Sequence, residues 1–477
     1  MLKLYNSLTR SVEDFKSITP GKVGMYTCGP TVYSFNHIGN FRTYFLGDLL
    51  LRTLKALEYD VDYIMNFTDV GHLTGDNLGD ADHGEDKMES AAAKEGKTAW
   101  ELAEFYIEAF MTDFEKLHMV HPREFVKVTD HIQEQIDLIQ TLEEKGYTYQ
   151  TSDGIYYDTS QFADYGQMSS LDHIKPIAQA QGEEVASFSR IEVNEEKRNP
   201  RDFALWKFSP TDQKRQMEWD SPWGVGFPGW HIECSAMSMK YLGETYDIHT
   251  GGMDLKETHH PNEIAQSEAA TGKKFVNYWI HGAFMLVNGE KMSKSKGNVY
   301  RLYDLEKEGY TAEALRYLYM QTHYRQEMNF TFGALDGATN ALGNLRADML
   351  KLPAGDSVNQ FYKEKFLEAL SDDLNTSAAL AVMWEMMKSV TSAKEKLPTL
   401  FFMDEVFGLG LREYYEEVGK KLSEPIPQEV REMVDERNRM RKDRQYVAAD
   451  HMRNRIKKMG YDVIDEGKLS HIKRIDS

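Results

Sequence analysis

The 477-residue chain has few cysteines and no long apolar runs. Its two cysteines, Cys28 and Cys234, cannot form a framework of several disulfide bonds, which favours a reducing compartment. No segment approaches the ~18 consecutive apolar residues that a membrane span requires. Residues 1–6 lack the apolar core and the small-residue cleavage site of a secretion signal. These absences predict a cytoplasmic protein with no membrane partner.

Positive charge is also scarce, because 56 Lys and Arg residues face 76 Asp and Glu residues, a net charge of −20. The mean field of such a chain repels a phosphate backbone, so we expect no DNA partner and no non-specific RNA binding. Residues 431–458 are an exception, with ten basic and five acidic residues. A segment of this kind is either a solvated helix face or a local RNA-binding site.

The remaining composition, 41% hydrophobic and 28% charged, is that of a globular protein with about three domains. The first hundred residues predict a β-α-β unit. Residues 23–27 are apolar and end at the breaker Cys28-Gly29-Pro30, leucines recur at helical spacing over 46–57, and residues 61–67 are apolar again. Ligands of a parallel sheet bind beyond the carboxyl ends of its strands, so Cys28 is predicted to lie at a binding site.

The rest of the chain divides by its patterns. Residues 71–90 are polar and acidic, and His72, Asp82 and His83 could bind a metal, although a solvated loop is the preferred interpretation. Two amphipathic helices are expected over 98–145, and short strands of an insertion over 147–220. A sheet pattern resumes near residue 246, and a helix over 259–271 stops at Gly272. From residue 311 onward the pattern predicts one helix after another, with a proline-bearing break at 424–427 before the basic tail.

His259 and Glu263 are four residues apart on the predicted helix and therefore project from one face, as metal-binding pairs do. Alone this spacing is common on exposed helices. Together with Cys28 and Cys234, the pair would complete a tetrahedral zinc site. The alternative is that both cysteines are buried and inert.

Two segments suit a nucleotide. His37-Ile38-Gly39-Asn40 joins the first strand to its helix, where free amides attract phosphate and Gly39 permits a close approach. The turn from Gly251 through Gly252 to Asp254 offers a carboxylate to ribose hydroxyls. Neither pattern is specific by itself.

The segment GEKMSKSKGN contains Lys291, Lys294 and Lys296 among serines and glycine. A loop of this kind can close on a triphosphate and stabilise charge as pyrophosphate leaves. A lysine-rich turn on its own is usually only solvated. This one follows a long segment whose pattern predicts a nucleotide-binding sheet.

HIGN followed far downstream by KMSKS resembles the two signature motifs of class I aminoacyl-tRNA synthetases. Further segments resemble the cysteinyl-tRNA synthetase family in particular, from the N-terminus to about residue 380 and more loosely in the tail. They are MYTCGPTVY, NFTDV, KRNPRDFALWK, PWGVGFPGWHIECSAM, GGMDL, HHPNEIAQ, NYWIHG, HYRQEMNF and DDLNT.

The resemblance implies an α/β fold: a Rossmann-type parallel-sheet catalytic domain over residues 1–310 with a connective insertion at about 115–225. A tRNA-binding helical bundle over 311–422 and a small anticodon-binding tail over 423–477 would follow. The implied activity is ligation of cysteine to tRNA(Cys) through a cysteinyl-adenylate, with ATP and L-cysteine as the other substrates and Mg²⁺ accompanying ATP.

Residue by residue, the resemblance makes one Zn²⁺ per chain the cofactor. Its implied ligands are Cys28, Cys234, His259 and Glu263. His37, Asn40, Lys291 and Lys294 would act on ATP, with Gly39, Gly252 and Asp254 helping to hold it. Gly29, Thr68 and Trp230 would line the amino-acid pocket.

Two departures from the family pattern stand out. Asn40 occupies the place of the second histidine of the class motif, and the end GKLSHIKRIDS lacks the tryptophan-containing terminus common in bacterial members. Two other functions would fit part of this pattern. A mycothiol-type cysteine ligase would act on an amino sugar and would not need the long helical region and basic tail. An RNA-binding paralogue without catalysis would not need intact motifs.

Overall fold

The computed structural model describes residues 1–71, 86–169, 196–210, 214–293, 296–423, 426–466 and 469–474. The chain forms two compact units, Met1–Gly410 and Leu411–Ser477, and each is described here by itself. The division into three parts near residues 310 and 422 remains a prediction.

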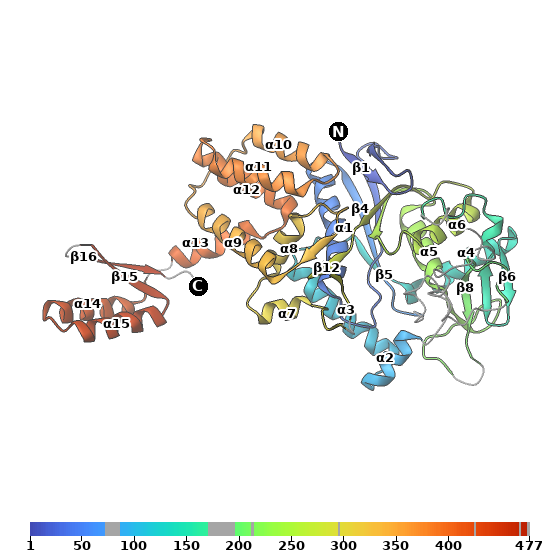
Figure 1. The fold of residues 1–477 in the computed structure, drawn as a ribbon, viewed down its shortest axis with the longest axis horizontal. Coiled ribbons are helices and arrows are strands. Elements are labelled where there is room, and N and C mark those ends of the chain that lie inside the picture. The colour runs from blue at the N-terminus through green and yellow to red at the C-terminus, as the bar shows by residue number, and fades with distance from the viewer. Residues whose placement is uncertain are drawn as a thin grey trace. The chain divides into compact units, whose positions relative to one another are not determined.

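A five-stranded parallel sheet organises the first unit (Figure 1). Its strands, in spatial order, are β11 (Val276–Gly282), β10 (Tyr246–Gly252), β3 (Lys22–Thr27), β4 (Asp60–Phe67) and β5 (Glu124–Lys127). All four neighbouring pairs run parallel. Strand β3 is central. Strands β4 and β5 follow it along the chain and lie on one side of it, and β10 and β11 come later and lie on the other side. The strand order therefore reverses between β3 and β10, which is where open α/β sheets bind ligands.

Helices connect these strands as the sequence pattern predicts. The leucine-rich helix is α1 (Ile38–Ala56), and α6 (His259–Thr271) ends at Gly272, whose φ of 70° is the left-handed turn that glycine favours. The other helices of this part are α2 (Lys87–Glu95), α3 (Ala99–Lys116), α4 (Ile132–Glu144) and α5 (Trp230–Leu242). The expected pair of helices over 98–145 corresponds to α3 and α4, but strand β5 lies between them and was not anticipated.

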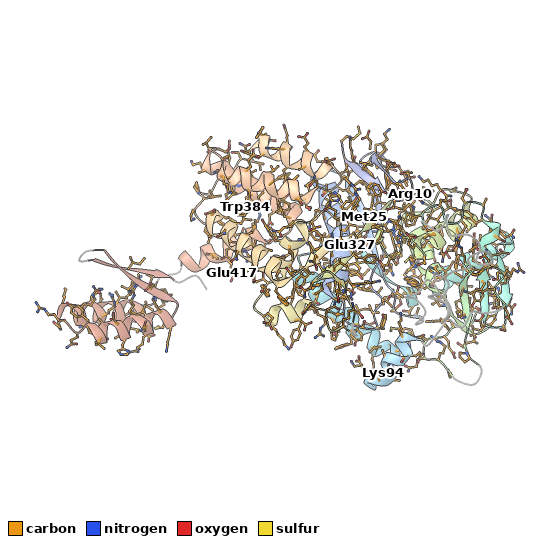
Figure 2. All side chains as sticks on the ribbon, in the orientation of Figure 1. Arg10, Met25, Lys94, Glu327, Trp384 and Glu417 are labelled. Atoms are coloured by element: carbon orange, nitrogen blue, oxygen red, sulfur yellow. The ribbon has the colours of Figure 1, made fainter. Side chains whose placement is uncertain are left out.

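The short strands expected over 147–220 form a separate four-stranded antiparallel sheet, whose last strand lies beyond residue 220. Its order is β6 (Thr148–Thr151), β7 (Gly154–Tyr157), β8 (Phe203–Phe208) and β9 (Gly226–Pro228). Ile155 and Trp206 pack with α4 and α5 in one buried cluster, which joins the insertion to the parallel sheet's helices. Around these sheets the side chains are densely placed (Figure 2), and Met25 of β3 is fully buried.

Small sheets and a helical region complete the first unit. The hairpin of β1 (Lys3–Asn6) and β2 (Ser11–Asp14) precedes the parallel sheet, and β12 (Met285–Val287), β13 (Glu290–Lys291) and β14 (Met328–Phe330) follow it. The helices are α7 (Leu302–Lys307), α8 (Ala312–Met320), α9 (Phe332–Met349), α10 (Gln360–Ser371), α11 (Thr376–Lys388) and α12 (Ala393–Phe407). The sequence predicts consecutive helices from residue 311 onward, but it does not predict strand β14 between α8 and α9.

The second unit contains α13 (Leu411–Ser423), α14 (Gln428–Lys442) and α15 (Tyr446–Lys458), with a hairpin of β15 (Tyr461–Glu466) and β16 (Leu469–Arg474). Val430, Met452 and Val463 belong to its own small buried core. Among the described residues, none of the helices is both long and apolar enough to cross a membrane.

A buried ion pair ties α1 to the helical region of the first unit. Arg316 of α8 is fully buried and pairs with Asp48 of α1, and it also donates to the carbonyls of Leu117 (2.9 Å) and Phe407. Burial alone would raise the pKa of Asp48, but Arg316 and Arg52 hold it below its ordinary value. Three separate segments therefore depend on one guanidinium group.

Arg316→Met should destabilise the first unit by about 3–5 kcal/mol, because it leaves the Asp48 carboxylate buried without its main partner. All seven tryptophans lie in residues 1–410, so urea unfolding followed by tryptophan fluorescence reports on this unit alone. The matched control is Lys273→Met, which removes an ion pair with Glu244 whose side chains are 63% and 52% exposed and should change little. Equal effects of the two substitutions would contradict this role of Arg316.

Candidate metal centre and nucleotide site

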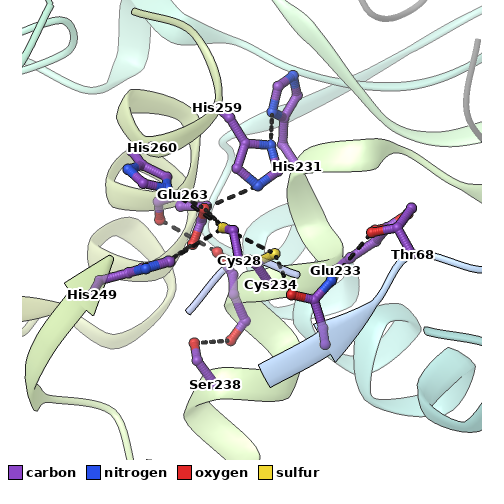
Figure 3. A network of polar contacts seen from close by, with 12 residues as sticks. Cys28, Thr68, His231, Glu233, Cys234, Ser238, His249, His259, His260 and Glu263 are labelled. Atoms are coloured by element: carbon purple, nitrogen blue, oxygen red, sulfur yellow. Dashed lines mark hydrogen bonds and ion pairs between the residues drawn. The ribbon is translucent and has the colours of Figure 1, made fainter. Parts of the chain in front are cut away.

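The four predicted metal ligands converge at the reversal point of the sheet (Figure 3). Cys28 follows β3 directly, Cys234 lies in α5, and His259 and Glu263 share one face of α6. All four are buried. The two Sγ atoms are 3.8 Å apart, Cys28 Sγ is 3.9 Å from Glu263 Oε1, and His259 Nε2 is 3.0 Å from the same oxygen. Segments as far apart as residues 28 and 263 thus present four ligand atoms to one point.

The donor set fits zinc. Zinc–sulfur bonds of about 2.3 Å at tetrahedral angles separate two sulfurs by about 3.8 Å, as found here. Two thiolates, one imidazole and one carboxylate are donors that Zn²⁺ accepts. Burial of both cysteines does not by itself separate a metal site from inert thiols, but with His259 and Glu263 at the same point the four residues form a group that could hold a metal ion.

The protonation of the metal-free cluster follows from its contacts. A hydrogen bond from Cys28 lowers the pKa of Cys234 to about 6, whereas burial raises the pKa of Cys28 well above its ordinary value. Burial would lower the pKa of His259, but Glu263 and Cys234 raise it to about 10. Burial would also raise the pKa of Glu263, yet His249 and His259 lower it to about 2. In the metal-free cluster Cys234 and Glu263 are therefore anionic, His259 carries an imidazolium charge beside them, and Cys28 keeps its proton.

Four further histidines surround the ligands, and the sequence interpretation did not include them. His231 Nδ1 is 3.1 Å from His259 Nδ1, His249 Nε2 is 2.9 Å from Glu263 Oε2, and His260 Nδ1 is 2.7 Å from His281 Nε2. All are buried. The sequence signal was available in part, because His260 adjoins His259 and His231 lies three residues before Cys234.

The three predicted pocket residues also lie around the cluster. Gly29 follows Cys28 and donates its N–H to Asn66 Oδ1 at 2.8 Å. The Thr68 hydroxyl donates a hydrogen bond to Glu233 Oε2 at 2.9 Å. The centres of the Trp230 and His259 rings are 4.3 Å apart. Burial, followed by the charge of Cys234, raises the pKa of Glu233 well above its ordinary value. Asn66 and Glu233 connect these residues but were missed, because a single buried polar residue carries no pattern.

The HIGN segment forms the start of α1. His37 is the N-cap: its Nδ1 accepts from the Asn40 amide at 3.2 Å, while Asn40 Oδ1 accepts from the His37 amide at 3.1 Å. Asn40 thus completes a capping box. This local role is one that a second histidine at this position would not serve in the same way.

The two motifs far apart in sequence meet in space. A Cβ atom on Gly39 would lie 2.4 Å from Met292 Cε, and the Ile38 amide donates to the Tyr300 carbonyl at 2.9 Å. Lys291 is exposed beside them. Lys294 lies outside the described residues, as do His72, Asp82 and His83.

The Gly252 turn lies at the end of β10, next to α1. A Cβ atom on Gly252 would stand 2.2 Å from Asp254 Oδ1 and 3.6 Å from Thr43 Oγ1. The glycine therefore makes room for the exposed Asp254 side chain at the same edge of the sheet as HIGN.

Comparison with known proteins agrees with this geometry. A model of the "tRNA synthetases class I (C) catalytic domain" matches residues 14–340, and the DALR domain matches residues 365–406. Among solved structures, a methionyl-tRNA synthetase of Mycobacterium tuberculosis has a TM-score of 0.55 at 18% identity, covering 84% of this chain and 93% of that one. A leucyl-tRNA synthetase of Agrobacterium radiobacter K84 has a TM-score of 0.57 at 13% identity, with 85% of each chain covered. These similarities show the fold, which is that of a class I synthetase.

Closer relatives extend over the whole chain. Cysteine–tRNA ligase 1 of Burkholderia lata is 45% identical over 465 residues, which is 97% of this chain and 95% of the relative. The cysteine–tRNA ligase of Treponema denticola is 40% identical over 503 aligned positions, covering 99% of this chain and all of the relative. The chain belongs to the cysteinyl-tRNA synthetase family.

Gly29→Ala should disrupt the metal centre, because the added Cβ would lie 1.6 Å from the Asn66 carbonyl oxygen and would force the chain beside Cys28 to move. We expect loss of bound metal by elemental analysis and a lower thermal midpoint. The matched control is Gly337→Ala in α9, where the added Cβ meets nothing within 4 Å and should stabilise the helix by roughly 0.5–1 kcal/mol. A Gly29→Ala protein with full metal content and an unchanged midpoint would refute this role.

Proposed function

We propose that this chain is a cysteine–tRNA ligase, which activates L-cysteine with ATP and transfers it to tRNA(Cys). The observation that carries the proposal is a set of three full-length relatives named cysteine–tRNA ligase, which are 38–45% identical to this chain and each cover 97–99% of it. The buried Cys28, Cys234, His259 and Glu263 cluster supports the amino-acid side of the reaction independently.

Cys28, Cys234, His259 and Glu263 would hold one Zn²⁺ per chain. Bound there, zinc would accept the thiolate of cysteine and discriminate against the hydroxyl of serine, which is a poorer ligand and harder to ionise. An ordinary pocket separates such near-isosteres poorly, so this selection makes a separate editing site unnecessary.

The residues next to the cluster would position the amino acid. Trp230, whose ring is tilted by 39° against that of His259, would close one side of the pocket. Thr68 would present its hydroxyl oxygen because its hydrogen is donated to Glu233. Gly29 keeps the chain close to Asn66 and leaves no side chain in the space beside Cys28. Holding the carboxylate still in this way favours its attack on the α-phosphate of ATP.

The nucleotide would bind along the start of α1. His37, Gly39 and Asn40 would meet the phosphates at the helix N-terminus, and Gly252 and Asp254 would face the ribose. Lys291, together with Lys294, would stabilise the charge that develops as pyrophosphate leaves, with Mg²⁺ accompanying the phosphates. No side chain needs to act as a covalent nucleophile. The chain's work is orientation and charge stabilisation.

The second unit would bind the anticodon end of tRNA. The last turn of α14 exposes Arg439, Arg441 and Lys442, and the connection to α15 exposes Arg444. The exposed ring of Tyr446 follows at the start of α15. Residues 444–448 and His451 line an open hollow of about 450 Å³. Cations beside an exposed ring suit single-stranded RNA, because phosphates pair with the cations and bases stack on the ring. The helical bundle over 311–422 would contact tRNA between the two ends.

The alternative activities differ in their acceptor. A mycothiol-type ligase would share the catalytic unit but would not need the exposed basic residues over 439–446, which we call the basic tip. A catalytically inactive paralogue would not keep the four buried ligands together. An ATP–pyrophosphate exchange assay with cysteine excludes the second alternative, and charging of tRNA excludes the first.

Cys234→Ser should lose metal and cysteine activation together, because a serine hydroxyl is not a thiolate donor at neutral pH. We expect metal content to fall from about one equivalent to near zero, and the exchange rate with it. The control is Ser238→Ala, one turn further along α5, which lies outside the ligand set and should keep both. Normal exchange without metal would contradict the proposed selection.

Replacing Arg439, Arg441 and Arg444 by glutamine should weaken tRNA charging but leave pyrophosphate exchange unchanged. Each lost phosphate contact on single-stranded RNA should reduce the slope of log affinity against log salt by about 0.7. The measurements are the KM for tRNA at several salt concentrations and exchange on the same preparation. A triple glutamine variant at the exposed Lys94, Lys351 and Lys394 controls for net charge. An identical loss in both triple variants would show that the tip is not a tRNA-binding surface.

A further inference from the structure

Three exposed aromatic rings adjoin one another beside the start of α1. Phe35 is 42% exposed, Phe105 of α3 is 40% exposed and Tyr303 of α7 is 49% exposed. The ring centres of Phe35 and Phe105 are 5.8 Å apart. The Arg301 guanidinium lies 4.7 Å from the ring centre of Phe35 and 5.5 Å from that of Tyr303, and it joins the third ring to the first two. We call Phe35, Phe105 and Tyr303 the aromatic surface.

A cation lies over each ring of this surface. Lys97 Nζ is 3.8 Å from the ring centre of Phe105, and Arg301 covers Phe35 as described. The Nζ atom of Lys307 is 4.4 Å from the ring centre of Tyr303. On a chain with a net charge of −20, cations gathered over exposed rings favour a partner that has both flat apolar groups and negative charge. A nucleic acid strand has both.

Two carboxylates share these cations. Glu95 Oε2 is 3.0 Å from Lys97 Nζ, and Asp304 Oδ2 is 3.4 Å from Arg301 Nε. A phosphate group would have to compete with these carboxylates, so the surface offers a strand stacking more than net positive charge. Bases of a single strand stack on aromatic rings and on the plane of an arginine guanidinium, largely irrespective of their sequence. A paired duplex keeps its bases stacked inside and cannot use such rings.

The aromatic surface adjoins the proposed nucleotide site. Phe35 precedes His37, the N-cap of α1, by two residues. The Ile38 amide donates to the carbonyl of Tyr300 at 2.9 Å, and Arg301 is the next residue. In the proposed transfer step, the terminal hydroxyl of tRNA must reach the cysteinyl group formed at this site. The unpaired nucleotides before that hydroxyl must therefore lie on surface adjacent to it.

We infer that the aromatic surface binds the unpaired 3′ end of tRNA by stacking, and that it thereby positions the terminal adenosine for transfer. The inference deepens the proposed function and rests on it, because the acceptor comes from that proposal. It assigns the 3′ end a contact that differs in kind from the basic tip, where exposed cations would bind phosphates. Stacking on rings whose cations are already paired depends little on salt, whereas phosphate contacts depend on it strongly.

The test replaces the rings without removing their apolar bulk. Phe105→Leu and Tyr303→Leu, made singly, should each slow transfer from preformed cysteinyl-adenylate to a tRNA(Cys) transcript by a factor of about 5 to 150, the range for loss of one stacked base. Pyrophosphate exchange, the KM for ATP and the salt dependence of charging should stay unchanged. Phe105→Tyr and Tyr303→Phe keep a ring at each position and should keep the transfer rate. The matched control is Trp100→Leu, which removes a 46% exposed ring from the same helix as Phe105.

A shortened transcript locates the contact on the RNA. The unmodified chain should bind the full tRNA(Cys) transcript more tightly than one that lacks the unpaired 3′ nucleotides, and the two leucine variants should reduce this difference. Equal binding of both transcripts by the unmodified chain overturns the inference, as does an equal loss for both in the variants. A raised KM for ATP in the variants would overturn it too, by assigning the rings to the adenine of ATP. If the unmodified chain does not charge tRNA(Cys) at all, the proposed function itself fails, so the two failures are distinguishable.

Discussion

The structure depends on the reversal of strand order between β3 and β10. At that point the carboxyl ends of two central strands diverge, and the segments that follow them cannot cover the space between. Cys28 leaves β3 on one side, and the Gly252 turn leaves β10 on the other. Helices α5 and α6 then bring their buried faces to the same edge. The candidate metal ligands, the residues around them and the start of α1 therefore all lie at this edge of the sheet.

Burying acidic groups at this edge of the sheet disfavours their ionised forms, and the neighbouring histidines offset this effect. A buried carboxylate and two thiols would resist ionisation if they were surrounded only by apolar groups. His249 and His259 instead lower the pKa of Glu263 to about 2, and the hydrogen bond from Cys28 lowers that of Cys234 to about 6. The cluster is stable as a network whose members compensate one another, and removing a single member affects all of them.

The sequence predicted most of what periodicity can show. The β-α-β start, α6 with its stop at Gly272 and the helical second half follow from local patterns, and so does the face shared by His259 and Glu263. Strands β5 and β14 were missed because they are only four and three residues long, which is too short for a period to register. His249, His281 and Asn66 were missed for a different reason. Their importance arises only when strands distant in sequence become neighbours, and no spacing along the chain records that. The tip at 439–446 showed its charge in the sequence, but the exposure of Tyr446 needed the structure.

Because the chain has only two thiols, a thiol-specific reagent reports on the candidate metal centre alone. Cys28 and Cys234 are the entire thiol content of the chain, both are buried, and both belong to the same cluster. Any alkylating or oxidising agent that consumes a thiol must therefore act on this one locus, with no background from other sites. If a metal binds this cluster, protection of the two sulfurs against such an agent measures the fraction of molecules that hold it. Oxidation of a thiol in this protein can likewise occur only at Cys28 or Cys234, and therefore only at this cluster.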